Sequence, residues 1–152
     1  MDQRLVKDLL DACHLARKAL QMLPPLPEGV VPRHAHVMDA IHHLAAEKDA
    51  VYVSDVGMVM KSTAPSITKL ITELEALGYV RKASVPGDRR FVALSLTKKG
   101  EKFYSLYVES YHAALAAALA DVGDDECRTA IRVLEALCGH VQAVTNGFFE
   151  RM

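Results

Sequence analysis

Apolar residues recur three and four positions apart over most of the chain, which is the spacing of one face of an α-helix. Polar and charged residues fill the positions between them. The pattern predicts helices over residues 2–22, 32–46, 55–60, 64–77, 98–120 and 125–149. In the last helix the spacing holds for about two and a half heptads, as in the seam of a coiled coil.

Residues at the ends of these segments favour helix starts and stops. Asp2, Ser54 and Thr97 are suited to cap the helices that follow them, because their side-chain oxygens accept free backbone amides. Pro32 is tolerated in a first helical turn, and Gly78 stands where a glycine commonly ends a helix. Side-chain chemistry therefore supports the boundaries that the periodicity predicts.

Two β-prone runs, residues 79–85 and 91–96, follow the helix over 64–77. Apolar and polar positions alternate in the second run, which predicts a strand with one buried face. Pro86-Gly87 between the runs suits a type II turn, so we expect a hairpin. Residues 51–53 predict a short edge strand. The expected fold class is mainly α with a small β-hairpin.

Charge is distributed unevenly along the chain. Residues 61–102 contain nine lysines and arginines against four acids, a net charge of +5. The remaining residues contain nine against fifteen, a net charge of −6, so the whole chain carries −1. A basic middle between acidic flanks is expected if only the middle contacts phosphates.

Two helices joined by the polar residues 61–63 and followed by a basic hairpin form the pattern of a winged helix-turn-helix. The second helix of such a pair enters the major groove, where its outward side chains read base edges. Arginines on the hairpin suit phosphate or the minor groove. The residues expected to contact DNA are Lys61, Ser62, Thr63, Ser66, Thr68, Lys69, Thr72, Arg81, Lys82, Arg89 and Arg90.

The motifs of this region resemble those of the MarR (multiple-antibiotic-resistance regulator) family. A Ser/Thr-rich stretch at 62–70 precedes Leu-Glu-Ala-Leu-Gly at 74–78, Asp-Arg-Arg at 88–90 and Leu-Thr-Lys-Lys-Gly at 96–100, in the family's order and spacing. The resemblance implies a sequence-specific, double-stranded-DNA-binding transcriptional regulator, a repressor released by a small-molecule effector. It also implies that Asp88 orients the arginine two positions on, Arg90, toward DNA.

The chain departs from the family pattern in three places. Val56-Gly57 stands where members usually carry Leu-Ala, and the turn Met60-Lys61-Ser62 lacks their usual glycine. Pro65 is also uncommon at its position. All three departures concern the local path of the turn and not the fold.

The resemblance further implies a homodimer joined by the first and last helices. The residues agree, because these terminal helices carry more apolar surface than a three-helix DNA-binding core could cover. We expect one MarR-like domain over 1–152, with a DNA-binding part at about 32–100 and dimerisation helices at about 1–23 and 101–152. Two recognition helices about 34 Å apart would then read a pseudo-palindromic site.

Small-molecule sensing is the commonest mode of regulation in the family, and its ligands are often phenolic acids. The resemblance implies a cleft between the dimerisation and DNA-binding regions. The candidate lining residues are Arg17, His42, Tyr107 and Tyr111, and the candidate effector is a small aromatic acid.

A redox or metal signal is the alternative. Cys13 resembles the peroxide-sensing cysteine that some members carry in the first helix; its apolar surroundings favour burial, whereas neighbouring His14 would favour the thiolate. His42 and His112, with Glu109, resemble the zinc-binding residues of other members. Apart from that candidate, we expect no metal and no cofactor.

Other classes of protein receive less support. An enzyme is not expected, because the sequence has no Gly-rich phosphate loop, HExxH or GxSxG motif. It has no apolar run near the roughly 18 residues of a membrane span and no signal-peptide core, so we expect a cytoplasmic protein. Cys13, Cys127 and Cys138 form no CxxC pair and are expected to be small buried hydrophobes. A winged-helix module that contacts proteins is the alternative from a different class.

Overall fold

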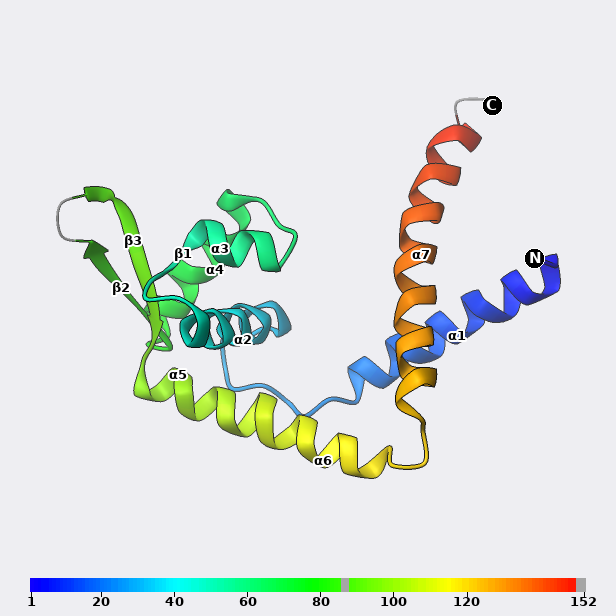
Figure 1. Ribbon diagram of the computed structural model, residues 1–152, viewed down its shortest axis with the longest axis horizontal. Helices are drawn as coiled ribbons and strands as arrows, with labels where there is room; N and C mark the ends of the chain where they lie inside the picture. The colour runs from blue at the N-terminus through cyan, green and yellow to red at the C-terminus, as the bar shows by residue number, and fades with distance from the viewer. Residues whose placement is uncertain (86–87, 150–152) are drawn as a thin grey trace. The chain divides into compact units, whose positions relative to one another are not determined.

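The computed structural model describes residues 1–85 and 88–149, except for the side chains of residues 85, 88–91 and 149. The chain divides into two units, with the boundary between Ser110 and Tyr111. The first unit contains helices α1 to α5 and a three-stranded sheet, and the second contains α6 and α7 (Figure 1). Within the described residues, no helix is both long and apolar enough to span a membrane.

The first two helices begin as the sequence predicts. α1 (Gln3–Gln21) is capped by Asp2, whose carboxylate accepts a hydrogen bond from the Arg4 amide at 3.3 Å. No residue of α1 is buried. α2 (Pro32–Glu47) begins at its proline. Its buried side chains are His34, Val37, Met38, Ala40, Ile41 and Leu44.

α3 (Val53–Val59) begins two residues earlier than predicted, directly from strand β1 (Val51–Tyr52). Ser54 therefore lies inside the first turn, and the prediction that it caps this helix is wrong. The Asp55 carboxylate serves that end instead, because it accepts the Tyr52 amide at 2.8 Å. The last residue of β1, Tyr52, is therefore also the residue at the cap position of α3.

α4 (Ala64–Ala76) follows the turn of residues 60–63 and carries Pro65 in its first turn, where a missing amide costs little. Gly78 ends the helix with a φ of +78°. Lys61 in the turn has a φ of +47°, a left-handed conformation in which a side chain costs about 1–2 kcal/mol. The turn thus keeps a glycine-like path without a glycine.

The sheet has the antiparallel order β1, β3 (Asp88–Leu96), β2 (Val80–Val85). β1 is an edge strand, as predicted, and its Val51 lies opposite Leu94. β3 begins three residues earlier than expected, and the Pro86-Gly87 turn lies outside the described residues. The β2–β3 ribbon extends beyond helices α2 to α4 (Figure 1).

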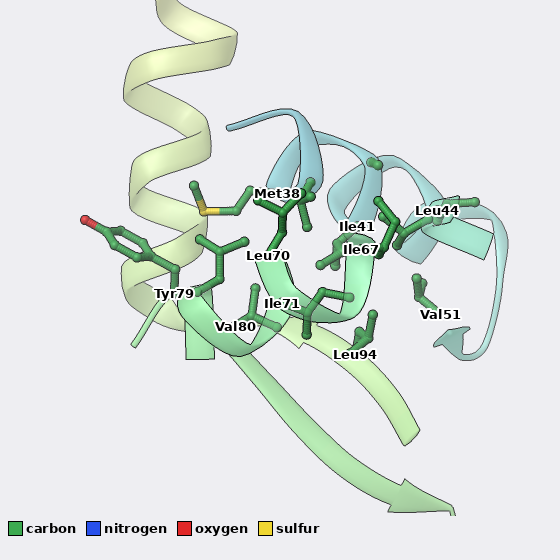
Figure 2. Close-up of a cluster of buried hydrophobic side chains, with 14 of the residues drawn as sticks. Met38, Ile41, Leu44, Val51, Ile67, Leu70, Ile71, Tyr79, Val80 and Leu94 are labelled. Atoms are coloured by element: carbon green, nitrogen blue, oxygen red, sulfur yellow. The ribbon is translucent and has the colours of Figure 1, made fainter. Parts of the chain in front are cut away.

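Helices α2 to α4 and the sheet enclose one hydrophobic core (Figure 2). Its largest fully buried side chains are Met38, Ile41, Ile67, Ile71, Leu74, Val37, Val51 and Val56. α4 contributes Ile67, Leu70, Ile71 and Leu74, three and four residues apart, so one face of this helix is buried. The core therefore fixes which side chains of α4 point outward.

The end of α4 and the start of α5 (Lys98–Phe103) meet at one joint. The Thr97 hydroxyl donates to the Gly78 carbonyl oxygen at 2.7 Å and accepts the Gly100 amide at 3.1 Å, which confirms Thr97 as the cap of α5. The Lys99 ammonium donates at 2.7 Å to the carbonyl oxygen of the residue that caps α4. The motifs at 74–78 and 96–100 are thus two halves of the same joint.

The helix expected over 98–120 is not uniform. α5 leads into a π-helical segment, Tyr104–Ser110, which is followed by α6 (Tyr111–Ala118). The Ser110 hydroxyl donates at 2.7 Å to the Ser105 carbonyl oxygen, five residues earlier, in keeping with the wider π turn. The expectation of one regular α-helix is therefore wrong.

The second unit leaves its apolar side chains uncovered. α6 buries no residue, and the described side chains of α7 (Asp124–Phe149) are exposed or half-buried. Cys127 and Cys138 are exposed and Cys13 is half-buried, so the expectation of buried cysteines is wrong for the single chain. The exposed large apolar residues of α7 are Ile131, Leu134, Val141, Val144 and Phe148.

The joint yields a test of stability. A Cβ at position 100 would overlap the carbonyl oxygen of Tyr79, which is backbone and cannot turn aside. We predict that Gly100→Ala lowers the free energy of unfolding by about 1–3 kcal/mol, measured by urea unfolding. The control is Gly139→Ala in α7, where a Cβ meets nothing within 4 Å and should be neutral or stabilising. Equal effects of the two substitutions would contradict the packing at the joint.

Candidate nucleic-acid interface

The turn and the outward face of α4 carry the polar residues expected to read DNA. The exposed members are Lys61, Thr63, Thr68, Lys69 and Thr72, and the half-buried members are Ser62 and Ser66. Because the opposite face of α4 is fixed in the core, these side chains have a defined direction. The structure thus places seven expected residues on one turn and one helix.

The turn lies close against α3. The Ser62 amide donates to the Gly57 carbonyl oxygen at 3.0 Å, and a Cβ at Gly57 would lie 3.3 Å from the Ser62 carbonyl oxygen. A side chain there would push the turn outward. Glycine at position 57 therefore suits the path that this turn takes.

Arg33, in the first turn of α2, joins the same surface and was not found by the sequence analysis. Its Nη2 donates to the Ser62 hydroxyl oxygen at 3.2 Å and to the Ser66 hydroxyl oxygen at 3.3 Å. Arg33 and Ser66 lie 33 positions apart in the sequence, and Arg33 lies outside the basic segment 61–102. Only the folded chain reveals it.

The neighbouring His34 ties α2 to α4 from inside. The Val31 amide donates to its Nδ1 at 3.2 Å, so the ring proton is on Nε2, which donates to the Glu73 carboxylate at 2.9 Å. The side chain is 3% exposed. This histidine thus links α2 to α4 by hydrogen bonds, a role that its sequence position did not indicate.

The cations expected on the wing differ in their contacts. Lys82 pairs with Glu75 of α4 at 2.8 Å and donates to the Thr72 hydroxyl at 3.2 Å, so it fastens the wing to the helix. Arg81 is exposed. The side chains of Asp88, Arg89 and Arg90 lie outside the described residues, although their backbone belongs to β3.

Asp55 holds the beginning of α3 by charge as well as by hydrogen bonding. Its second oxygen accepts the Lys48 ammonium at 2.6 Å. The hydrogen bond from Lys48 and the one from the Tyr52 amide lower the pKa of this carboxyl below its ordinary value of 3.8, against the opposing effect of burial. The carboxylate form is therefore stabilised in the folded chain.

His42, an effector candidate, lies in an aromatic contact. Its ring stacks on Tyr104 with centroids 3.8 Å apart, and its Nδ1 lies 3.2 Å from a carboxylate oxygen of Glu101. Burial raises the pKa of Tyr104, and the nearby carboxylates of Asp39, Glu109 and Glu101 raise it further. His42 is therefore held by side chains of its own unit.

The other effector candidates are spread over three elements. Tyr107 is half-buried and stacks on Phe103 with centroids 4.7 Å apart. Arg17 is exposed on α1, and Tyr111 is half-buried in the second unit. Of the four, His42 and Tyr107 belong to the packed part of the first unit.

The redox candidate and the metal candidates lie on different helical elements. Cys13 is half-buried on α1, and His112 is exposed on α6. Glu109 accepts the Ser105 hydroxyl at 3.3 Å. Over the described part of the chain, no group of three or more His, Cys, Asp and Glu side chains is placed to hold a metal ion.

The segment that carries most of this interface matches a known protein family. The MarR family model matches residues 31–90, from just before α2 into the first residues of β3. None of the curated proteins compared is similar enough in sequence to match.

Solved structures extend the likeness to nearly the whole chain. FabT of Streptococcus pneumoniae, solved in complex with DNA, has a TM-score of 0.65 and 21% identity over 94% of this chain and 99% of its own. BpsR of Bordetella bronchiseptica, whose DNA binding is regulated by 6-hydroxynicotinic acid, has 0.63 and 17% over 88% and 98%. PcaV of Streptomyces coelicolor, solved with its natural ligand, has 0.61 and 18% over 89% of each chain. At these identities the likeness establishes the fold.

The Asp55 contacts predict a dependence of stability on pH. A carboxyl with a lowered pKa in the folded chain stabilises it above the ordinary pKa, and the contribution is lost as the pH falls through the lowered value. Asp55→Asn should therefore lower the free energy of unfolding by about 1–2 kcal/mol at pH 7 and by much less near pH 3. Asp49→Asn, at an exposed position nearby, is the control. A deficit that is the same at both pH values would contradict the ion pair.

Proposed function

Because the chain belongs to the MarR family of winged-helix transcriptional regulators, DNA-binding proteins that are not enzymes, we propose that it binds a pseudo-palindromic duplex as a homodimer. We further propose that it represses transcription until a small effector releases it. The observation that carries the proposal is the outward polar face of α4, held by the core beside a cationic wing. Such a regulator would act in the cytoplasm.

The DNA contacts follow from this arrangement. α4 would enter the major groove, where Thr68 and Lys69 would reach base edges. Arg81, with Arg89 and Arg90 of the wing, would contact phosphate or the minor groove. The remaining expected contacts are Lys61, Ser62, Thr63, Ser66, Thr72 and Lys82, with Asp88 orienting the wing.

Lys82 and Thr72 have a second role in this scheme. Lys82 of the wing contacts Thr72 and Glu75, which both lie on α4, so that the two DNA-binding elements move together. Part of the Lys82 charge is offset by this pairing. We therefore assign most of the phosphate attraction of the wing to its arginines.

Dimerisation is supported by apolar surface that the single chain does not cover. Large apolar side chains are exposed on α1 and on α7, among them Leu15, Leu20, Ile131 and Val144. Monomeric proteins seldom expose so many, and a second copy with two-fold symmetry would bury the same faces on both chains. We assign dimerisation to about 1–23 and 101–152, within one MarR-like domain over 1–152.

The proposed effector is a small aromatic acid, the class to which the 6-hydroxynicotinic acid of BpsR belongs. Arg17, His42, Tyr107 and Tyr111 are its candidate contacts. An effector acts only through its different affinities for the free and DNA-bound states, typically worth about 5–150-fold in DNA affinity. Peroxide acting on Cys13, and zinc bound by His42 and His112, are the alternative signals.

DNA binding is tested by the salt dependence of affinity. We predict that Arg90→Ala weakens binding to every duplex and flattens the salt slope by about one unit per bound protomer, measured by fluorescence anisotropy. Thr68→Ala is the comparison, because a base contact should change sequence preference more than the salt slope. An Arg90→Ala protein with unchanged affinity and slope would refute the role of the wing.

Dimerisation is tested by placing a charge on the apolar face of α7. Ile131→Glu should raise the dimer dissociation constant at least about tenfold in analytical ultracentrifugation, because an unpaired carboxylate would be buried in the interface. Thr129→Glu adds the same charge at an exposed polar position of the same helix and should have little effect. A folded native chain that sediments as a monomer at micromolar concentration would rule the dimer out.

A further inference from the structure

Arg33 carries a positive charge that no acid among the described side chains offsets. Its side chain is exposed, and no described carboxylate lies within ion-pair distance. Two lysines among the proposed DNA contacts differ from Arg33 in this respect. Lys82 pairs with Glu75 at 2.8 Å, and Lys69 lies 4.0 Å from Glu73. An arginine fixed at a surface without a counter-charge is suited to an anionic partner.

The contacts of Arg33 leave donors available to such a partner. A guanidinium has five N–H groups, and Nη2 directs its two to Ser62 and Ser66. The three on Nε and Nη1 have no partner among the described residues. Each serine hydroxyl accepts from Arg33, so its own hydrogen is free to point elsewhere. The cluster of Arg33, Ser62 and Ser66 thus presents donors to solvent.

The chemistry of this cluster matches a phosphate. Phosphate oxygens are acceptors that carry negative charge, and arginine with hydroxyl donors is a frequent way to hold them. The cluster also spans α2, the turn and the first turn of α4, so a group bound there would contact three elements at once. An internal structural role alone would leave three charged donors unused.

We propose that Arg33 binds a phosphate of the DNA backbone beside the recognition helix, with Ser62 and Ser66 holding its side chain in place. This inference rests on the proposed function and extends the DNA-binding surface to α2, outside the turn, α4 and the wing. Arg33 fixes the position of the protein on the duplex and reads no base.

The test compares Arg33→Gln, Arg33→Lys and the control Ala46→Glu in anisotropy titrations over a salt series. Ala46 is exposed in the last turn of α2 and belongs neither to the proposed DNA contacts nor to the dimerisation segments, and its substitution lowers the net charge by one, as Arg33→Gln does. The probes are a duplex selected from a random pool and a scrambled duplex of the same length. Arg33→Gln should weaken binding to both by about tenfold and flatten the salt slope by about one unit per bound protomer. Arg33→Lys should keep most of the slope, and Ala46→Glu should leave affinity and slope unchanged.

Three results would overturn the inference. Unchanged affinity and slope for Arg33→Gln would show that Arg33 makes no contact with DNA. A loss confined to the selected duplex would indicate a base contact instead of a phosphate contact. An equal loss for Ala46→Glu would indicate a general effect of net charge. If the native protein binds neither duplex, the proposed function itself fails, which is a different outcome from a native protein that binds and a variant that matches it.

Discussion

The buried stripe of α4 is the interaction on which the rest of the structure depends. Ile67, Leu70, Ile71 and Leu74 pack into the core between α2 and the sheet. Burying each side chain is worth about 1.5–3 kcal/mol, so together they are comparable to the whole stability of a typical domain. Turning α4 by one residue would expose part of this stripe. The outward face, and with it the proposed contacts to DNA, therefore has one available direction.

Polar contacts then define the position of α4 at each end. At its beginning, Arg33 holds the turn and the first helical turn, and His34 reaches Glu73 further along. At its end, Lys99 and Thr97 bind the last carbonyl groups. Each such hydrogen bond is worth only about 0.5–1.5 kcal/mol, so their main effect is on geometry. A protein that reads base edges needs that geometry, because a groove contact depends on where a helix lies.

Periodicity and capping chemistry predicted most of the fold because these signals are local. The helix starts at Asp2, Pro32 and Thr97 match the structure closely. Ser54 is not the cap because the helix already begins at Val53, and Asp55 accepts the Tyr52 amide from inside the first turn. The π-helical segment had no local signature, since its apolar residues fit a regular helix equally well.

The interface was predictable in outline and not in its supports. Composition and motif order located the turn, α4 and the wing. Arg33 and His34 were missed because their partners lie 29 to 39 residues away, and no local pattern links them. Lys82 counted as a free cation in the sequence, whereas folding brings Glu75 to it. Exposed cysteines on α7 were unexpected because an apolar stripe predicts burial without saying whether the same chain supplies the cover.

The central claim is that two copies of α4, held by this core, read one DNA site together. Selection of duplexes from a random pool with the purified protein, followed by sequencing, tests it most directly. The account predicts enrichment of two inverted half-sites whose centres lie about 10 base pairs apart. Enrichment of a single half-site, or of no sequence at all, would contradict it.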